Sequence, residues 1–272
     1  MNAIVVITTK EIKTLSDITI RYMEHYAKKW GAELIVITED DIDIVKYQHP
    51  KYYIMSVSEI VGYDRILLLD ADIFVKPDSP NIFEVFPEKD VFYAYNEVEL
   101  RNNAWKQRYE RIINTHATQN GLKRAKFRKE HWNGGVTLFP GNRVRDLFKM
   151  PPWKVTDSTY TYSPGNSVKQ QPWRNYLISI SGITCKDMGR KYNCLPSSRN
   201  RLSPKKCYFI HLTGFPGWRG GELFKLNYLR KASKDCLVDK KDLTRINNLL
   251  KNKKFIERKK RNAKGITKKT IR

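Results

Sequence analysis

Short apolar runs and longer amphipathic segments alternate along the amino-terminal part of the chain. Residues 1–10 and 32–38 each contain an apolar run of the length of a buried strand. Between them, apolar residues recur at helical spacing over residues 11–30, and Gly31 follows as a stop signal. This alternation predicts right-handed β-α-β units and therefore an α/β fold with a mostly parallel sheet flanked by helices.

The same patterns predict the remaining elements. Strands are expected over residues 64–75, 90–95, 136–139 and 208–211. Helices are expected over residues 50–61, 82–85, 143–148 and 173–180, with a loop over residues 150–172. The basic, aromatic insert at residues 100–131 would either border an acceptor cleft or form a solvated helical face. We predict one domain over residues 1–250 and a basic tail over residues 251–272.

Two aspartates follow one of the predicted strands. Asp70 and Asp72 come directly after the apolar run at residues 66–69. Side chains two residues apart on extended backbone point the same way, so both carboxylates can reach one divalent cation. In an open α/β sheet, ligands bind at this end of the strands. Two solvated carboxylates in a turn are the alternative. Asp64 is expected to pair with its neighbour Arg65.

Three segments occur in an order typical of one family: Asp-Ala-Asp at residues 70–72, Trp-Asn-Gly-Gly-Val at residues 132–136 and His-Leu-Thr-Gly at residues 211–214. Over residues 1–220 the chain resembles the GT-A glycosyltransferases, especially the glycogenin-like enzymes of glycosyltransferase family 8. The resemblance implies a Rossmann-like GT-A fold. It also implies metal-dependent transfer of a sugar from a nucleoside diphosphate to a glycan or protein acceptor, with retention at the anomeric carbon.

The resemblance assigns a metal-binding set to three residues. Asp70, Asp72 and His211 would hold Mn²⁺ or Mg²⁺, and Asp70 would also approach the ribose of the nucleotide. Oxygen ligands suit both ions, and imidazole suits the softer Mn²⁺. The cation would stabilise the negative charge of the departing diphosphate. A purely structural histidine is the alternative for His211.

Amide and glycine residues are expected around the transferred sugar. Asn133 would hydrogen-bond a sugar hydroxyl, while Gly134 and Gly135 would let the backbone approach the sugar. A tight turn before the next strand is the alternative. Gln171 is a second expected sugar contact, with an ordinary helix start as its alternative. Gln170 stands where related enzymes have an acid, so this position offers no carboxylate base or nucleophile.

The donor nucleotide, expected to be a UDP-sugar, has its own set of candidate residues. Thr8 and Thr9 end the first strand, and Lys51 matches a basic residue that helps to hold the donor in the family. Surface charge is the alternative for Lys51. Gly214 completes the His-x-x-Gly segment. The phosphate-binding lysine of the family is replaced by glycine here, and Arg219 is expected to supply the positive charge.

The composition is that of a globular protein with a large excess of positive charge. Hydrophobic residues make up 40% of the chain and aromatic residues 12%. No apolar run approaches the roughly 20 residues of a membrane-spanning helix. The formal net charge is +23, and residues 251–272 hold eleven Lys or Arg against Glu257. Such a tail is expected to be attracted to anionic surfaces, including membranes.

This charge raises a function of a different class. A protein with a pI of 9.8 can bind nucleic acid through its basic residues. The sequence lacks an RNA-recognition, KH or helix-turn-helix signature, so no specific nucleic acid is expected. A catalytically inactive domain that binds sugar nucleotides is the third interpretation. The residues alone leave both alternatives open.

The four cysteines and the amino terminus predict a compartment. No two cysteines form a CxxC pair, which argues against a zinc site and a dense disulfide framework. Free thiols are expected, with a Cys185–Cys194 bridge as the alternative. The amino terminus lacks a basic leader and a long apolar stretch, so no signal peptide is expected. These features predict a cytoplasmic protein, peripheral to a membrane if the tail binds one.

Overall fold

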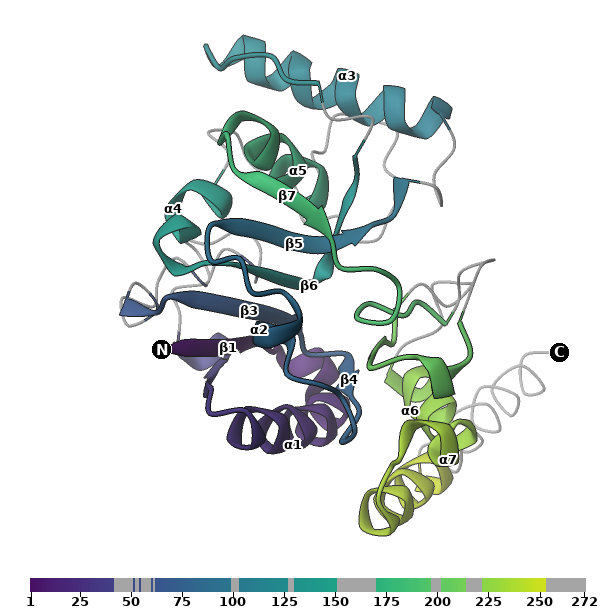
Figure 1. The fold of residues 1–272 in the computed structure, drawn as a ribbon. Helices are drawn as coiled ribbons and strands as arrows, with labels where there is room; N and C mark the ends of the chain where they lie inside the picture. Colours follow the sequence, from purple (N-terminus) through teal and green to yellow (C-terminus); the bar gives the residue numbers. More distant parts are fainter. Residues whose placement is uncertain are drawn as a thin grey trace, which may run out of the picture.

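The computed structural model describes residues 1–41, 51, 54, 60, 62–98, 103–126, 130–150, 170–196, 202–213 and 222–252. Its elements form a central sheet with helices on both faces (Figure 1). The helix predicted over residues 50–61 and the loop predicted over residues 150–172 lie mostly outside these residues, as does the basic tail.

A six-stranded sheet forms the centre of the molecule, in the order β2-β1-β3-β6-β5-β7. Its strands are β1 (Asn2–Ile7), β2 (Glu33–Ile37), β3 (Arg65–Asp70), β5 (Val91–Asn96), β6 (Trp132–Pro140) and β7 (Thr184–Asp187). β1 is parallel to β2 and β3, and β5 is parallel to β7. Only β6 runs against its neighbours β3 and β5 in this sheet of the described residues. The sheet is therefore mostly parallel, as predicted.

The strand predicted over residues 64–75 is two strands. β3 ends at Asp70, the chain turns, and β4 (Ile73–Val75) pairs antiparallel with β8 (Phe209–His211) in a separate two-stranded sheet. The Thr19 hydroxyl donates to the carbonyl oxygen of Ala71 in this turn, at 2.6 Å. His211 therefore reaches the end of β3 from a second sheet, not from a further strand of the central one.

Helices of very different lengths surround the strands. They are α1 (Lys13–Lys29), α2 (Ile82–Val85), α3 (Asn103–Gln119), α4 (Val144–Leu147), α5 (Gln170–Ile180), α6 (Glu222–Lys231) and α7 (Ser233–Cys236). Residues 240–252 are also helical. Short 3-10 turns cover Lys10–Ile12, Glu39–Asp41, Gly141–Arg143 and Pro204–Lys206. None of the described helices combines the length and apolar character needed to cross a bilayer.

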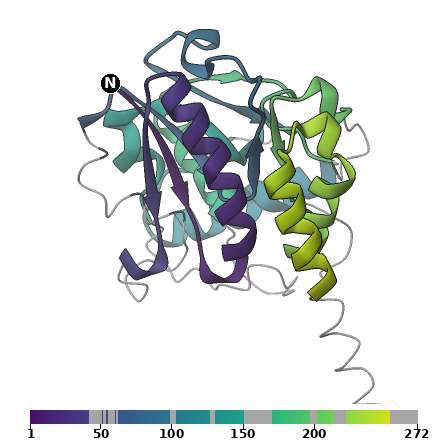
Figure 2. The same cartoon turned by 90° about the horizontal axis from the view of Figure 1, so that it is seen from below.

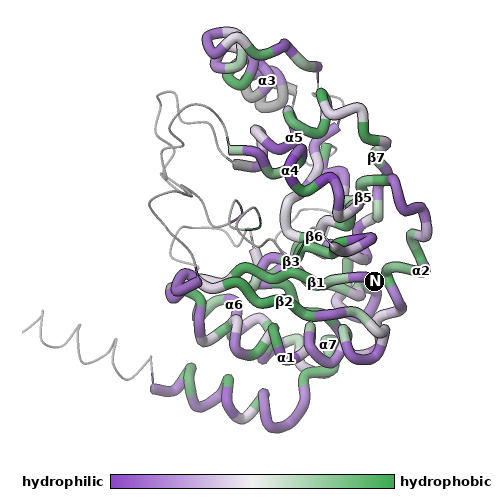
Figure 3. The backbone as a smooth tube through the Cα atoms, turned by 90° about the vertical axis from the view of Figure 1, so that its left-hand side faces the viewer, coloured by the Kyte–Doolittle hydropathy of each residue, from purple (hydrophilic) through white to green (hydrophobic). Residues whose placement is uncertain are grey.

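The two faces of the sheet are buried by different helices. Ile4 and Leu67 point to one face and pack with Tyr26 of α1. Val5 and Leu68 point to the other face, which packs against α4 and α5. Because neighbouring side chains of a strand point to opposite faces, strands buried on both sides are apolar throughout. Figure 3 shows these strands as hydrophobic segments enclosed by more polar helices.

Two peripheral groups of helices extend beyond the sheet. α6, α7 and residues 240–252 share a hydrophobic core with α1 and the β4–β8 pair (Figure 2). α3 packs on α5 at the opposite end of the molecule (Figure 1). The insert at residues 100–131 thus contains a helix whose inner face is buried. Both groups lie beside the end of β3 that carries the two aspartates, and each contributes side chains there.

Three local expectations are corrected by the tertiary contacts. Asp64 pairs with the amino group of Met1 at 2.7 Å, whereas the neighbouring Arg65 points away and donates to the carbonyl oxygen of Phe83. Adjacent side chains of a strand lie on opposite faces, so they cannot pair with each other. The segment Asn133–Gly135 lies inside β6, so the tight-turn alternative is wrong.

The cysteine expectation is also wrong in part. Cys194 and Cys207 form a disulfide, and their Cα atoms are 6.0 Å apart because Cys194 bridges to Ile210 of β8. Cys185 and Cys236 are free. Burial raises the pKa of both free thiols to about 12, which makes them poor nucleophiles.

Candidate active site

Asp70, Asp72 and His211 converge on one point at the end of β3. One ligand atom from each residue lies within 4.8 Å of the others. His211 Nε2 lies 3.6 Å from Asp70 Oδ2 and 3.4 Å from Asp72 Oδ1. Asp70 is the last residue of β3, Asp72 lies in the following turn, and His211 is the last residue of β8. The ligand set that the resemblance implies is thus brought together in space.

Two lysines pair with the outer oxygens of the aspartates. Lys51 Nζ lies 2.7 Å from Asp70 Oδ1 and donates to the carbonyl oxygen of Gly134 at 2.8 Å. Lys225 Nζ, from α6, lies 2.6 Å from Asp72 Oδ2. Each carboxylate therefore uses one oxygen for a lysine and turns the other toward His211. This division leaves the inner oxygens as potential metal ligands.

The pKa values of these groups follow from burial and from their partners. Burial by itself would raise the pKa of Asp72, but attraction and hydrogen bonding to His211 and Lys225 hold it well below its usual value. Burial lowers the pKa of Lys51, and the charge of Asp70 opposes this effect. Asp72 is therefore an anion at neutral pH, the form in which a carboxylate binds a metal.

The two glycines of β6 make room for the side chains of the site itself. A Cβ atom at Gly135 would overlap the ring of His211. A Cβ atom at Gly134 would lie 2.5 Å from Arg174 Nη2 and 2.9 Å from Lys51 Nζ. Glycine is therefore required here because side chains cross the strand at close range, which is a different reason from the expected approach to a sugar.

A hydrogen-bond chain orients His211. Asn133 Oδ1 accepts from the backbone N–H of Gly135 and from Asn193 Nδ2, each at 2.8 Å. Asn193 Oδ1 lies 3.0 Å from His211 Nδ1. A backbone N–H can only donate, so the amide oxygen of Asn133 must face it. Asn193 then presents its own oxygen to His211, which places the ring proton on Nδ1 and leaves the lone pair of Nε2 facing the carboxylates.

Gln171 lies on the first turn of α5, close to Gly134. Its amide nitrogen donates to Glu97 Oε1 at 2.6 Å and lies 2.9 Å from His131 Nε2. Its amide oxygen lies 3.4 Å from the backbone nitrogen of Gly134. The structure therefore places Gln171 and Asn133, the two predicted sugar contacts, in one network with the residues around the metal-binding set.

The remaining candidates are placed only in part. Ile7 of β1 pairs with Asp70, so Thr8 and Thr9 continue toward the same edge of the sheet. The buried hydroxyl of Thr8 has no hydrogen-bond partner among the described residues. Gly214 and Arg219 lie outside the described part of the chain.

Three residues of this site were absent from the sequence prediction. Glu97 directly follows the strand predicted over residues 90–95, so the strand-end rule that selected Asp70 also applies to it. Asn193 and Lys225 carry no comparable signal, because neither belongs to a motif. Their neighbours come from distant parts of the chain: Lys225 and Asp72 are 153 residues apart.

The sequence model of the family described as Glycosyl transferase family 8 matches residues 6–212. The chain belongs to glycosyltransferase family 8. The match covers most of the chain and contains both aspartates, the Asn-Gly-Gly segment and His211. The protein is therefore a glycosyltransferase with the α/β fold of the GT-A enzymes, as the resemblance implied. A sequence search of curated proteins finds no significant match.

Several solved glycosyltransferases resemble the structure at low sequence identity. The galactosyltransferase LgtC, in complex with donor and acceptor sugar analogs, is 13% identical, with a TM-score of 0.46 over 93% of this chain and 96% of that chain. A glycosyltransferase involved in glycosylation of the major capsid of PBCV-1 is 13% identical, with a TM-score of 0.43 over 78% and 93%. GlyE of Streptococcus pneumoniae TIGR4 is 12% identical, with a TM-score of 0.46 over 93% and 65%. The family assignment rests on the sequence match and not on these scores.

Proposed function

We propose that this family 8 enzyme transfers a sugar from a nucleoside-diphosphate donor to a glycan or glycoprotein acceptor with a divalent cation held by Asp70, Asp72 and His211. The observation that carries the proposal is the convergence of these three ligands within 4.8 Å. Two carboxylate oxygens and an unprotonated imidazole nitrogen suit Mn²⁺ better than Mg²⁺, which prefers oxygen ligands. A UDP-sugar is the donor that we propose.

The chemistry of the site fits a reaction with an anionic leaving group. When bound, the cation would neutralise negative charge that develops on the departing diphosphate. Lys51 and Lys225 add two positive charges at the same corner, so the side chains of the protein themselves favour binding of a diphosphate. The proposal includes retention at the anomeric carbon, which the anomer of the first-formed product tests by NMR.

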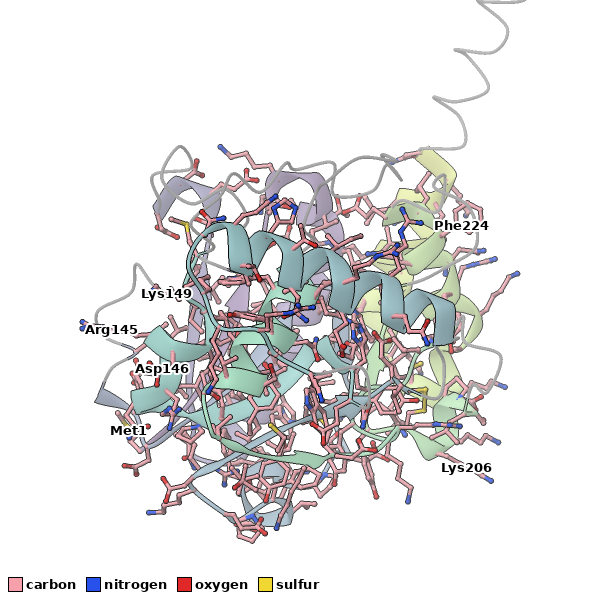
Figure 4. All side chains as sticks on the ribbon, turned by 90° about the horizontal axis from the view of Figure 1, so that it is seen from above. Met1, Arg145, Asp146, Lys149, Lys206 and Phe224 are labelled. Carbon is pink, nitrogen blue, oxygen red and sulfur yellow. A yellow bond between two sulfur atoms is a disulfide. The ribbon has the colours of Figure 1, made fainter. Side chains whose placement is uncertain are left out.

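The deciding experiment measures donor hydrolysis and transfer with UDP-, GDP- and dTDP-sugars, in Mn²⁺ and in EDTA. We expect EDTA to abolish turnover and Mn²⁺ to restore it, and Asp72→Asn to lower kcat/KM by at least about a hundredfold. The matched control is Asp146→Asn, which removes an exposed carboxylate of α4 at the edge of the molecule (Figure 4). We expect wild-type activity for this control.

Two results would contradict the proposal. Turnover that is indifferent to EDTA and to Asp72→Asn would exclude a metal at this site. Metal-dependent thermal stabilisation by one nucleotide sugar without any turnover would identify an inactive, donor-binding protein instead.

We also propose a cytoplasmic enzyme whose tail at residues 251–272 binds an anionic membrane surface. The support is the charge of that segment alone. The proposal predicts sedimentation of the full chain with vesicles that contain phosphatidylserine at low salt, and release at high salt. Equal sedimentation with neutral phosphatidylcholine vesicles would contradict it.

A further inference from the structure

Glu97 is a buried carboxylate that holds two amides at once. It follows β5, and its side chain is only 2% exposed. Its Oε1 accepts from the amide nitrogen of Gln171 at 2.6 Å, and its Oε2 accepts from the amide nitrogen of Asn133 at 3.3 Å. His131 Nε2 lies 3.3 Å from Oε1. The carboxylate therefore links α5 to β6 at the centre of the candidate site.

An ionised carboxylate accepts hydrogen bonds and donates none. Gln171 must therefore turn its NH₂ group toward Glu97, which turns its carbonyl oxygen toward Gly134. The amide of Asn133 is oriented in the same way. Its oxygen faces the N–H of Gly135, which confirms the orientation independently. A single acceptor thus determines which end of each amide faces the interior of the site.

The orientation of Asn133 passes to His211 through one further residue. The oxygen of Asn133 accepts from Asn193 Nδ2 at 2.8 Å, which leaves the oxygen of Asn193 for His211 Nδ1 at 3.0 Å. Each donor in this series is matched by an acceptor, and the series starts at a group that can only accept. Reversal of any amide would place two donors or two acceptors against each other inside the protein, at a cost of about 1–3 kcal/mol.

We propose that Glu97 is a positioning residue that sets two polarities of the active site. It determines which end of Gln171 faces the sugar corner. Through Asn133 and Asn193 it also determines which nitrogen of His211 carries the proton. The consequence for metal binding rests on the proposed function, whereas the tautomer of His211 is a property of the metal-free protein.

The test is Glu97→Gln in the full chain. A glutamine at this position offers one oxygen and one NH₂ group, so either Gln171 or Asn133 faces a second donor and must turn over. We expect NMR of the metal-free protein, at a pH where imidazole is neutral, to show that His211 loses its single Nδ1–H tautomer. We also expect Mn²⁺ affinity, measured by EPR, to fall by about 10- to 100-fold, with a larger loss in kcat than in donor affinity.

Two further variants make the result interpretable. Glu24→Gln removes an exposed carboxylate of α1 and is expected to behave as wild type in every measurement. Asn193→Leu breaks only the branch toward His211, so it should change the tautomer and Mn²⁺ affinity and leave the Glu97–Gln171 contact intact. It also decides the inference if Glu97→Gln does not fold.

The outcomes separate the inference from the proposed function. A folded Glu97→Gln protein with the wild-type tautomer and the wild-type kcat would overturn the positioning role. An unchanged tautomer in Asn193→Leu would overturn the branch toward His211. Failure of the wild-type protein to bind Mn²⁺ would instead overturn the proposed function, and the tautomer measurement would still decide the role of Glu97.

Discussion

Asp72 serves two kinds of partner with its two oxygens. Oδ2 pairs with Lys225, and Oδ1 faces His211. Together with Asp70 and Lys51, the group holds two negative and two positive charges. The corner is thus close to neutral before any cation enters. A divalent cation adds two positive charges, which the diphosphate of a donor would offset. We therefore expect cation and donor to bind cooperatively.

Lys225→Met should strengthen binding of Mn²⁺ in the absence of nucleotide. The lysine competes with the cation for Asp72, and loss of its charge should raise Mn²⁺ affinity by about tenfold. Donor affinity should fall at the same time, because one positive charge beside the diphosphate is lost. EPR titration with and without UDP measures both effects. Lys231→Met, at the exposed end of the same helix, is the control. Weaker Mn²⁺ binding by Lys225→Met would refute the competition.

Gly135→Ala should disrupt the site through contact with His211 alone. The added Cβ atom would overlap the imidazole ring, so β6 or β8 must shift. We expect a loss of about 1–3 kcal/mol in the free energy of unfolding and a large loss of turnover. Gly62→Ala is the matched control, since no atom lies within 4 Å of the Cβ position there. Urea unfolding and the donor assay measure both variants, and equal behaviour of the two would exclude the steric argument.

Secondary-structure elements were predictable where the chain is apolar and periodic. β1, α1, β2, β5 and β8 lie where hydrophobic patterns placed them. β7 was not predicted, because Thr184–Asp187 forms a largely exposed edge strand without an apolar pattern. The break between β3 and β4 was also missed. Both halves are apolar, and only the pairing of β4 with β8 separates them. Edge position and strand pairing are decided by neighbours that are remote in sequence.

α6 contributes to the site through its buried face. Leu226 is fully buried, whereas the side chain of Phe224 on the same helix is 52% exposed and lies at the periphery (Figure 4). Leu226→Ala should lower the free energy of unfolding by about 2–5 kcal/mol and loosen the Lys225–Asp72 contact. Phe224→Ala should change stability by less than about 0.5 kcal/mol. Equal thermal shifts for the two variants would contradict this division of the helix.

The disulfide joins the loop before β8 to the neighbouring segment and so affects the stability of the whole molecule. Cys194 and Cys207 are 13 residues apart in sequence. In the chain-entropy account, a loop of this length contributes about 3 kcal/mol. Cys194→Ala combined with Cys207→Ala should therefore lower the midpoint of urea unfolding, and reductant should have no further effect on that variant. An unchanged midpoint would show that the bridge adds no stability.

The sequence by itself determined the alternation of strands and helices, the aspartates at the end of a buried strand and the family. These properties depend on residues close together in the chain, where periodicity and spacing are visible. Only the tertiary structure decided that Lys225 pairs with Asp72, that Cys194 pairs with Cys207, and that Glu97 lies between Gln171 and Asn133. Those partners meet because strands and helices pack side by side, and packing brings together residues that no local pattern relates.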